Sequence, residues 1–396
     1  MAKNYDVVIA GGGVMGSAIA YFLGADPTFT GSVLVVERDP SYANCATTRS
    51  WGGIRQQFST PENIRMSQFA AQFVRQAVEL LAVDGECPDL AFRERGYLFL
   101  ASAGGDSRGQ TILESNVGLQ RSLGAEVELL APDELARRFP WLETGDLAAG
   151  AFGPRDEGWI DPSALLHAFR RKARALGAAY ATDEVVGIGR DGNRVTGVKL
   201  RTGEDIGCGI LVNAAGPQAG ALAALAGIDL PVRPRKRTTF VFDCREALPP
   251  LPLTIDPSGV AFRPEGAQYL AILSPPADRD PDSGDLEPDH AMFEDEIWPI
   301  LAARVPAFEA IKVTGAWGGH YDYNTFDQNA VLGPHPDLAN FLFCNGFSGH
   351  GIQQSPAAGR AIAEFIAYGG YRSLDLSALS YARIPAGRAI KEINVV

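Results

Sequence analysis

Asp6-Val7-Val8-Ile9-Ala10-Gly11-Gly12-Gly13-Val14-Met15-Gly16 is the stretch that decides the fold. Its first five residues form an apolar, β-branched run that is typical of a buried parallel strand. The glycines match the pattern G-x-G-x-x-G, and residues 17–23 then predict a helix. A second predicted strand, residues 33–36, delivers Glu37 at its carboxyl end. This order of strand, turn, helix and strand is typical of a dinucleotide-binding unit.

Each part of this segment has a physical task. Gly11 permits the tight turn from strand to helix, and Gly13 lets the backbone approach a pyrophosphate. Gly16 lets the helix pack closely on the strand, while the helix N-terminus supplies free N–H groups and a partial positive charge. Glu37 is placed to accept hydrogen bonds from a ribose, and its charge disfavours a 2′-phosphate.

A second match to the glycine pattern, residues 187–192, shows how weak the bare pattern is. Asp191-Gly192-Asn193 is typical of a tight turn, and residues 195–200 resemble a returning strand. Because no helix is predicted after it, we interpret this second match as a hairpin and the N-terminal match as the dinucleotide site.

Length, composition and charge limit the class of protein. The 396 residues suit two domains, and 46% hydrophobic with 21% charged residues is typical of globular chains. No segment approaches the ~18 consecutive apolar residues of a membrane span. Because a strand is predicted from the first residues onward, we expect no signal peptide. The five cysteines form no C-x-x-C pair, which favours reduced thiols and a cytoplasmic location. A formal net charge of −12 argues against a nucleic-acid partner.

The segment after Glu37 favours a flavin over a nicotinamide cofactor. A nicotinamide dehydrogenase normally continues with further β-α units, whereas residues 38–60 are polar and contain glycine. Thr60 and Pro61 then predict the N-cap and the first position of an amphipathic helix. A special loop in front of an ordinary helix can hold a flavin ring.

Two later strands are expected to complete the nucleotide-binding sheet. Residues 210–216 form an apolar strand that ends in small residues, although an ordinary strand-to-loop junction has the same appearance. Residues 341–344 form a buried strand, followed by the glycine-rich residues 345–354. Ser355 is expected to cap, and Pro356 to begin, a helix whose N-terminus would stabilise negative charge on a reduced flavin.

Five segments of the chain, residues 48–58, 234–237, 321–329, 346–354 and 392–396, carry a resemblance to a known family. They resemble the D-amino-acid oxidase superfamily of flavoproteins, on the branch of sarcosine oxidase and dimethylglycine dehydrogenase. Within this branch the chain is similar to the FAD-dependent oxidoreductase domain proteins related to a mitochondrial complex I assembly factor. The resemblance covers nearly the whole chain, and its motifs together are far more specific than the glycine pattern.

The resemblance implies an α/β fold, with a Rossmann-type FAD-binding domain and a discontinuous substrate domain whose antiparallel sheet, an α+β cap, covers the flavin. We expect residues 1–86, 150–220 and 326–396 in the FAD-binding domain, and residues 87–149 and 221–325 in the cap. The implied cofactor-binding residues are Gly11, Gly13, Val14, Met15, Gly16, Glu37, Arg38, Thr48, Arg49, Ser50, Val185, Ala214, Ala215, Gly216, Gly346, Gly349, His350, Gly351, Ile352 and Gln353.

Departures from the family pattern bear on the cofactor link and on the substrate. The cysteine that tethers the flavin in sarcosine oxidases is His320 here, and residues 49–51 replace the linking histidine of dimethylglycine dehydrogenase. We therefore expect non-covalent FAD. Sarcosine oxidases carry a lysine that pairs with the substrate carboxylate, and this chain has Gln353 at that place. The lysine that assists oxygen reduction in those enzymes has no clear counterpart here, because residues 269–273 are apolar. The exact substrate and the electron acceptor, oxygen or another, stay open.

The resemblance implies oxidation of a small amine or amino acid, with a secondary or N-methylated amine favoured. A hydride would pass from the C–H next to nitrogen to flavin N5, and the imine would then hydrolyse. Arg55 is the candidate partner of a substrate carboxylate, because its planar guanidinium suits bidentate pairing; a structural ion pair is the alternative. Tyr321 and Tyr323 are candidates to wall the pocket, and His350 and Gln353 complete the candidate catalytic set.

Two other functions fit the same motifs. One is FAD-dependent dehydrogenation of a 2-hydroxy acid, which flavin bleaching by hydroxy acids but never by amines would indicate. The other is an FAD-containing assembly or interaction factor with little catalysis, in which the flavin would stay oxidised with every substrate. His167, His290 and His335 show no metal-ligand spacing, so no metal site is expected.

Overall fold

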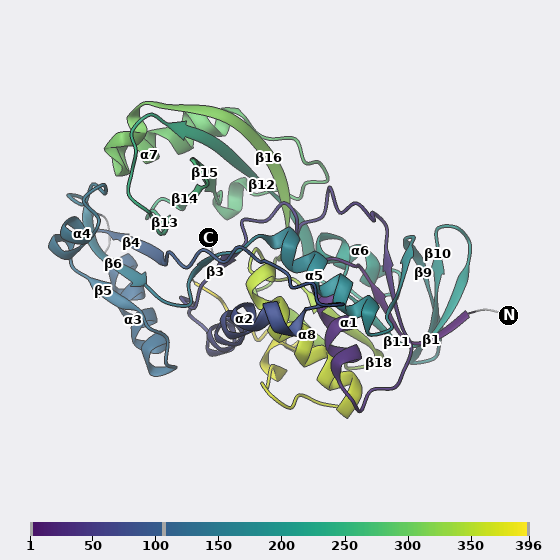
Figure 1. Ribbon diagram of the computed structural model, residues 1–396. Helices are drawn as coiled ribbons and strands as arrows, with labels where there is room; N and C mark the ends of the chain where they lie inside the picture. Colours follow the sequence, from purple (N-terminus) through teal and green to yellow (C-terminus); the bar gives the residue numbers. More distant parts are fainter. Residues whose placement is uncertain (1–2, 105–107, 394–396) are drawn as a thin grey trace.

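The computed structural model describes residues 3–104 and 108–393, so the last three residues of the 392–396 segment lie outside it. Two large sheets organise these residues, and Figure 1 shows them as separate layers. Helices α1, α2, α5 and α8 gather along the first sheet, while strands β12 to β16 form much of the second layer. The α/β class and the second, mostly antiparallel sheet are as predicted.

The first sheet has the order β17-β18-β11-β1-β2-β8, and the β9–β10 hairpin joins it through β11. Its central strands β18, β11, β1, β2 and β8 run parallel. The antiparallel pairing of β9 with β10 confirms that the second glycine match is a hairpin. The bounds are β1 (Lys3–Ala10), β2 (Val33–Glu37), β8 (Ala179–Thr182), β9 (Val185–Asp191), β10 (Arg194–Leu200), β11 (Asp205–Asn213), β17 (Val331–His335) and β18 (Leu338–Asn345).

Helices cover one face of this sheet, and the hairpin with α6 covers part of the other. Phe73 of α2 and Phe169 of α5 stack with ring centroids 5.3 Å apart, which joins two of the covering helices. Asp161 caps α5 by accepting hydrogen bonds from the backbone N–H groups of Ser163 and Ala164. The bounds are α1 (Val14–Ala25), α2 (Pro61–Leu80), α5 (Pro162–Ala175), α6 (Ala219–Ala224) and α8 (Gly351–Tyr368).

The second sheet has the order β16-β12-β15-β14-β13-β4-β6-β5. One face packs on a core that includes α4 and α7, and the other faces α3 and the first layer. The strand bounds are β4 (Tyr97–Ser102), β5 (Glu128–Leu130), β6 (Leu147–Gly153), β12 (Val232–Cys244), β13 (Leu253–Ile255), β14 (Val260–Glu265), β15 (Gln268–Leu273) and β16 (Ile311–Asn324). Strand β6 runs across residue 149, where a domain boundary is expected, and the division into domains stays a prediction.

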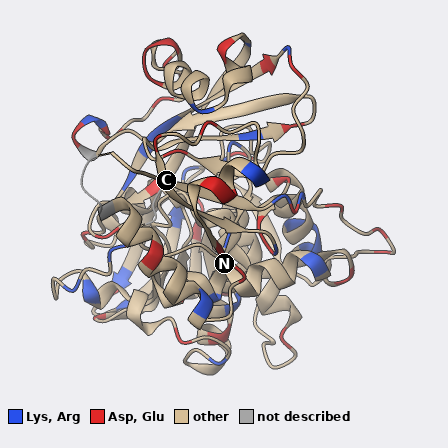
Figure 2. Cartoon of the chain, turned by 90° about the vertical axis from the view of Figure 1, so that its left-hand side faces the viewer, with Lys and Arg blue, Asp and Glu red and all other residues tan. Residues whose placement is uncertain are grey.

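Short elements join the two layers. Strands β3 (Gly53–Ile54) and β7 (Gly158–Trp159) pair with each other. The remaining helices are α3 (Arg108–Ser122), α4 (Pro132–Arg138), α7 (Trp298–Arg304), a π-helical turn (Phe293–Ile297) and 3₁₀ turns at Gly216–Gln218, Ala277–Arg279, Pro306–Glu309, Ser377–Leu379 and Tyr381–Arg383. Figure 2 shows acidic and basic positions interspersed over both layers. Across the described ranges, every helix is too short or too polar to cross a membrane.

Helix α8 begins at Gly351, which corrects the expected start at Pro356. The proline lies inside the helix and has no N–H for the carbonyl of Ile352, four residues earlier. The Ser355 hydroxyl donates to that carbonyl at 2.9 Å instead. This substitute hydrogen bond lets the helix run through the proline, so Gly351, Ile352 and Gln353 belong to its first turn rather than to a loop.

We expect Ser355→Ala to lower the free energy of unfolding by about 1–2 kcal/mol, because the buried Ile352 carbonyl loses its partner. The same substitution in a Pro356→Ala background is expected to cost close to nothing, since the restored backbone N–H then bonds that carbonyl. Urea unfolding of the four proteins with saturating FAD measures the coupling. Equal costs in both backgrounds would contradict this account of the helix.

Candidate active site

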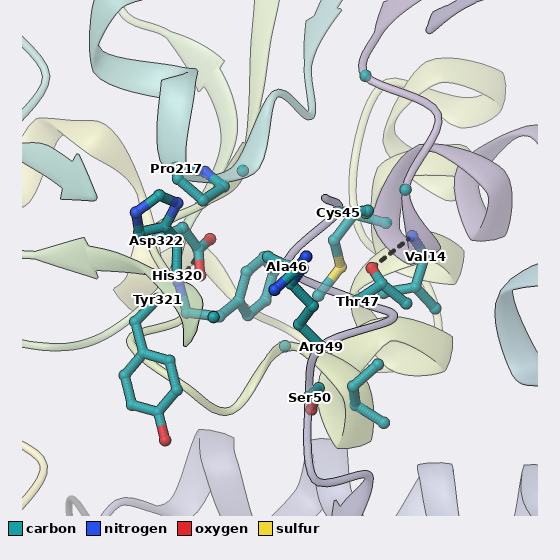
Figure 3. Close-up of a pocket in the computed structure, with 18 of the residues that line it drawn as sticks. Val14, Cys45, Ala46, Thr47, Arg49, Ser50, Pro217, His320, Tyr321 and Asp322 are labelled. Atoms are coloured by element: carbon teal, nitrogen blue, oxygen red, sulfur yellow. Dashed lines mark hydrogen bonds between the residues drawn. The ribbon is translucent and has the colours of Figure 1, made fainter. Parts of the chain in front are cut away.

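A cavity of about 550 Å³ extends between the carboxyl ends of β1 and β2 and the second sheet. Segments far apart in sequence line it, among them Gly11, Glu37, Ala214, Tyr321 and His350. Figure 3 shows part of this lining: Val14 and Thr47 lie on one side, His320, Tyr321 and Asp322 on the other, and Arg49 between them. The glycine turn and the glycine-rich C-terminal segment therefore meet at one cavity, as the sequence predicts.

The glycine turn lies in tight contact with the neighbouring strand. Gly11 has φ +104°, and a Cβ there would lie 2.3 Å from the carbonyl oxygen of Ala214. A Cβ on Gly16 would lie 1.9 Å from the carbonyl oxygen of Gly11. Both positions therefore exclude any larger side chain unless the backbone moves.

The N-terminus of α1 offers donors to an anion. Its N-cap is Gly13, which provides no side-chain cap, and the N–H of Val14 bonds the Thr47 hydroxyl at 3.2 Å (Figure 3). Glu37 accepts from the N–H groups of Gly12 and Asp39, at 2.8 and 2.9 Å, and a carboxylate has lone pairs for further donors. A helix N-terminus that lacks an N-cap side chain, beside an acidic strand end, fits the pyrophosphate and ribose of a dinucleotide.

Arg55 and His350 form a buried pair at the other end of the cavity. The Arg55 guanidinium lies 3.9 Å from the ring centroid of Phe58, donates to the Gln57 carbonyl, and places Nη2 3.1 Å from Nε2 of His350. Burial, together with the nearby charge of Arg55, lowers the pKa of His350 well below its usual range. The imidazole is therefore neutral at neutral pH, and its Nε2 can accept from Arg55.

Gln353 and two tyrosines complete this end. The Gln353 side chain accepts the backbone N–H of Arg55 at 2.8 Å, which holds the first turn of α8 against the 55–57 segment. Burial raises the pKa of Tyr97 and of Tyr321, so both hydroxyls stay protonated at neutral pH. Both tyrosines line the cavity, where their hydroxyls can donate hydrogen bonds to a ligand.

Most of the predicted site residues line this cavity. They are Gly11, Gly13, Val14, Met15, Glu37, Arg38, Arg49, Ser50, Arg55, Val185, Ala214, Ala215, Gly216, Tyr321, Gly349, His350, Gly351, Ile352 and Gln353. Gly16, Thr48, Tyr323 and Gly346 lie outside the lining.

These outlying residues support the neighbouring loops. The Tyr323 ring faces the Arg235 guanidinium at 5.6 Å, and the Thr48 hydroxyl donates to the Tyr42 carbonyl at 2.6 Å. The N–H of Gly346 donates to Asp322 at 2.7 Å, and burial raises the pKa of that carboxyl to about 6. Tyr323 lies outside the cavity lining, and its role in the pocket wall stays a prediction.

Sequence reasoning named Tyr321 but did not identify six further residues of the second sheet that belong to the site. These residues are Tyr97, Thr239, Leu253, Ile255, Ala261 and Ile272, and all line the cavity. Their strands do show period-two alternation, but alternation marks two faces without saying which one meets the cofactor.

His320 occupies the cavity wall where sarcosine oxidases were expected to carry a cysteine. It lies near Pro217 and Asp322 in Figure 3. Its Nε2 atom is buried without a hydrogen-bond partner among the described residues, and burial lowers the pKa of the ring. No cysteine is present at this place, and non-covalent binding of FAD stays a prediction.

Glu157 links the 55–57 segment to the second sheet. Its carboxyl accepts the backbone N–H of Gln56 at 2.6 Å and the Gln57 amide at 2.7 Å. Burial raises the pKa of this carboxyl to about 7, although the hydrogen bonds and the Arg55 charge oppose the rise. The folded protein therefore binds the proton of Glu157 more tightly than the unfolded chain does.

The sign of the resulting pH dependence follows from this raised pKa. The stability that Glu157 contributes is fully present below the unfolded pKa of 4.5 and is lost as the pH rises through about 7. We expect Glu157→Gln to flatten the fall in unfolding free energy between pH 5 and pH 8 by about 2–3 kcal/mol. Denaturant unfolding across this range measures the slope, with the exposed Glu79→Gln as control. An unchanged slope in Glu157→Gln would contradict the prediction.

A family model covers most of the chain. The model described as FAD dependent oxidoreductase, DAO, matches residues 6–365. The chain belongs to the DAO family. Its sequence is 45% identical to FAD-dependent oxidoreductase domain-containing protein 1 of Xenopus laevis, over all of this chain and 85% of that protein. It is 28% identical to sarcosine oxidase subunit beta of Arthrobacter sp, over 98% of this chain and 93% of that one.

Solved structures agree with the DAO family assignment. L-proline dehydrogenase from P. horikoshii superposes with a TM-score of 0.85 and 26% identity, covering 98% of this chain and all of the other. The chain is thus an FAD-dependent oxidoreductase whose relatives include amino-acid oxidases and dehydrogenases. FAD is the dinucleotide that the glycine turn and Glu37 fit.

Proposed function

We propose that this DAO-family chain oxidises a small amine or amino acid, with a secondary or N-methylated amine favoured, at the carbon next to nitrogen. One observation carries the proposal: the cavity that begins at the glycine turn ends at a buried arginine, a neutral histidine and two protonated tyrosines. A cationic anchor beside uncharged donors suits a carboxylate and an amine in one small molecule. The relatives named for sarcosine and L-proline support the same substrate class.

The proposed roles follow from these contacts. Bound FAD supplies the hydride acceptor, and the protein orients the substrate carbon toward it. Arg55 binds the substrate carboxylate, while His350 and Gln353 hold Arg55 and the first turn of α8 in place. Tyr97 and Tyr321 donate hydrogen bonds, and the N-terminus of α8 stabilises negative charge that develops nearby. Water then hydrolyses the released imine.

Anaerobic reduction tests the proposal. The purified holoprotein is mixed with sarcosine, proline derivatives, D- and L-amino acids, polyamines and 2-hydroxy acids, and the flavin band near ~450 nm is recorded. Bleaching by one class of amine supports the proposal, and readmitted oxygen then separates an oxidase from a dehydrogenase. Bleaching by hydroxy acids alone would replace amine oxidation by C–O oxidation. A flavin that no substrate reduces would instead favour an assembly or interaction factor.

We also propose that FAD is held without a covalent bond, because His320 replaces the linking cysteine. Acid denaturation is expected to release the yellow cofactor into the supernatant. Flavin that stays with the precipitated chain would contradict this.

A further inference from the structure

A row of aliphatic side chains lies on the cavity face of the second sheet. Thr239 pairs with Ile272, Ile272 with Ala261, and Ala261 with Ile255, across the four neighbouring strands β12, β15, β14 and β13. Residues directly opposite each other in a sheet point to the same face. All four line the cavity, as does Leu253, two residues before Ile255 on the same face. The part of the cavity lining that β13, β14 and β15 supply is therefore apolar.

Two polar groups next to this row, the Thr239 hydroxyl and the Nη atoms of Arg237, are already paired. The Thr239 hydroxyl accepts a hydrogen bond from the Trp51 indole N–H at 2.9 Å. Arg237, which also lines the cavity, forms a buried bidentate pair with Asp280 at 2.7 and 2.9 Å. A polar or charged substrate side chain that lies on Ile255, Ala261 and Ile272 would lose its water, and these three side chains offer it no hydrogen-bond partner.

Ala261 forms a recess in the row. It stands between Ile255 and Ile272, so the wall is lower at the centre than at its two sides. A branched or cyclic apolar group can fill such a recess, whereas glycine or sarcosine would leave it unused. Filling a preformed apolar recess gains contact with the wall on three sides.

We propose that the substrate is an amino acid with an apolar side chain or ring, which lies on the row formed by Ile255, Ala261 and Ile272. This inference rests on the proposed amine oxidation and specifies its substrate class. Each buried methylene contributes about 0.8 kcal/mol, which is roughly a fourfold gain in kcat/KM. Leucine is therefore expected to exceed alanine by roughly sixty-fold, and glutamate and lysine to be poor substrates.

The first test compares side chains at constant amine chemistry. Anaerobic flavin reduction by the holoprotein is measured with glycine, alanine, valine, threonine and leucine, each also N-methylated. Rates that rise with apolar length, and fall from valine to the isosteric threonine, support the inference. Reduction that is fastest with glycine or sarcosine would overturn the inference and leave amine oxidation standing, whereas no reduction by any amine would overturn amine oxidation itself.

A second test compares kcat/KM for leucine and alanine in variants of the row. Valine and threonine have the same shape, so Ile272→Val and Ile272→Thr differ only by a hydroxyl. We expect the ratio of kcat/KM for leucine to that for alanine to be about tenfold lower in Ile272→Thr than in Ile272→Val. Ala261→Leu fills the recess and is expected to invert the preference between leucine and alanine. Val313→Thr, on an exposed part of β16, is the matched control.

Unreactive carboxylates provide the binding measurement. Perturbation of the flavin spectrum by acetate, butyrate and 4-methylpentanoate is expected to yield dissociation constants that fall with chain length in the native protein. The fall is expected to vanish in Ala261→Leu. Equal constants for the three acids in the native protein would overturn the inference even if no amine is oxidised.

Discussion

Replacing Arg55 by methionine is expected to lower kcat/KM for an amino-acid substrate by roughly 100- to 1000-fold. Removing one partner of a buried charge pair costs about 2–5 kcal/mol, because the other charge is left desolvated. In the proposed complex, that other charge is the substrate carboxylate. Arg55→Lys keeps the charge and loses the planar fork, so it is expected to recover only part of the activity.

If Arg55 only held the local structure and did not bind the substrate carboxylate, its replacement would affect all substrates alike. Its contacts with Gln57 and His350 hold the same segment, so a substitution could lower activity without any substrate contact. The matched amine that lacks a carboxylate separates the two cases: binding predicts a large loss for the amino acid alone. Equal losses for both substrates would assign Arg55 to structure. Arg263→Lys is the control, because that arginine is buried near Trp51 and Trp159 but lies outside the cavity lining.

Replacing Gly16 by alanine is expected to reduce bound FAD to less than about a tenth and to lower the free energy of unfolding by about 3 kcal/mol. Helix propensity alone predicts the opposite, since alanine stabilises a helix by about 1 kcal/mol relative to glycine. Steric contact makes the net change in unfolding free energy negative, because a Cβ at Gly16 would lie 1.9 Å from the Gly11 carbonyl oxygen. Helix α1 must then move away from the turn that holds the pyrophosphate.

Gly118→Ala is the matched control for this prediction. Gly118 lies in helix α3, is exposed, and has open space where a Cβ would be placed. Its replacement is expected to stabilise the protein slightly and to leave FAD content unchanged. The flavin-to-protein absorbance ratio and thermal unfolding measure both variants. If Gly16→Ala retains full FAD and gains stability as Gly118→Ala does, the close packing of α1 on the turn is not required.

Local signals predicted the FAD-binding half well. The strand before Gly11, the glycine turn and Glu37 are contiguous, and each favours its structure by short-range sterics or hydrogen bonding. The expected start of α8 was wrong for a local reason as well. Ser355 and Pro356 match the signature of a helix start, but the Ser355 hydroxyl replaces the missing proline donor and lets the helix begin earlier.

The sequence by itself predicted a dinucleotide cofactor, because the glycine turn and Glu37, which fit a dinucleotide, occur in one short, ordered stretch. Only the tertiary structure decided which side chains of the second sheet line the cavity. Both faces of the second sheet are apolar: Phe240 and Phe262 point into one core, and Ile272 and Ala261 into the cavity. The alternation of residues along each strand separates these two sets. It cannot tell which set faces the cavity, because burial is equally favourable for both. The way the second sheet packs over the cavity determines which face lines it.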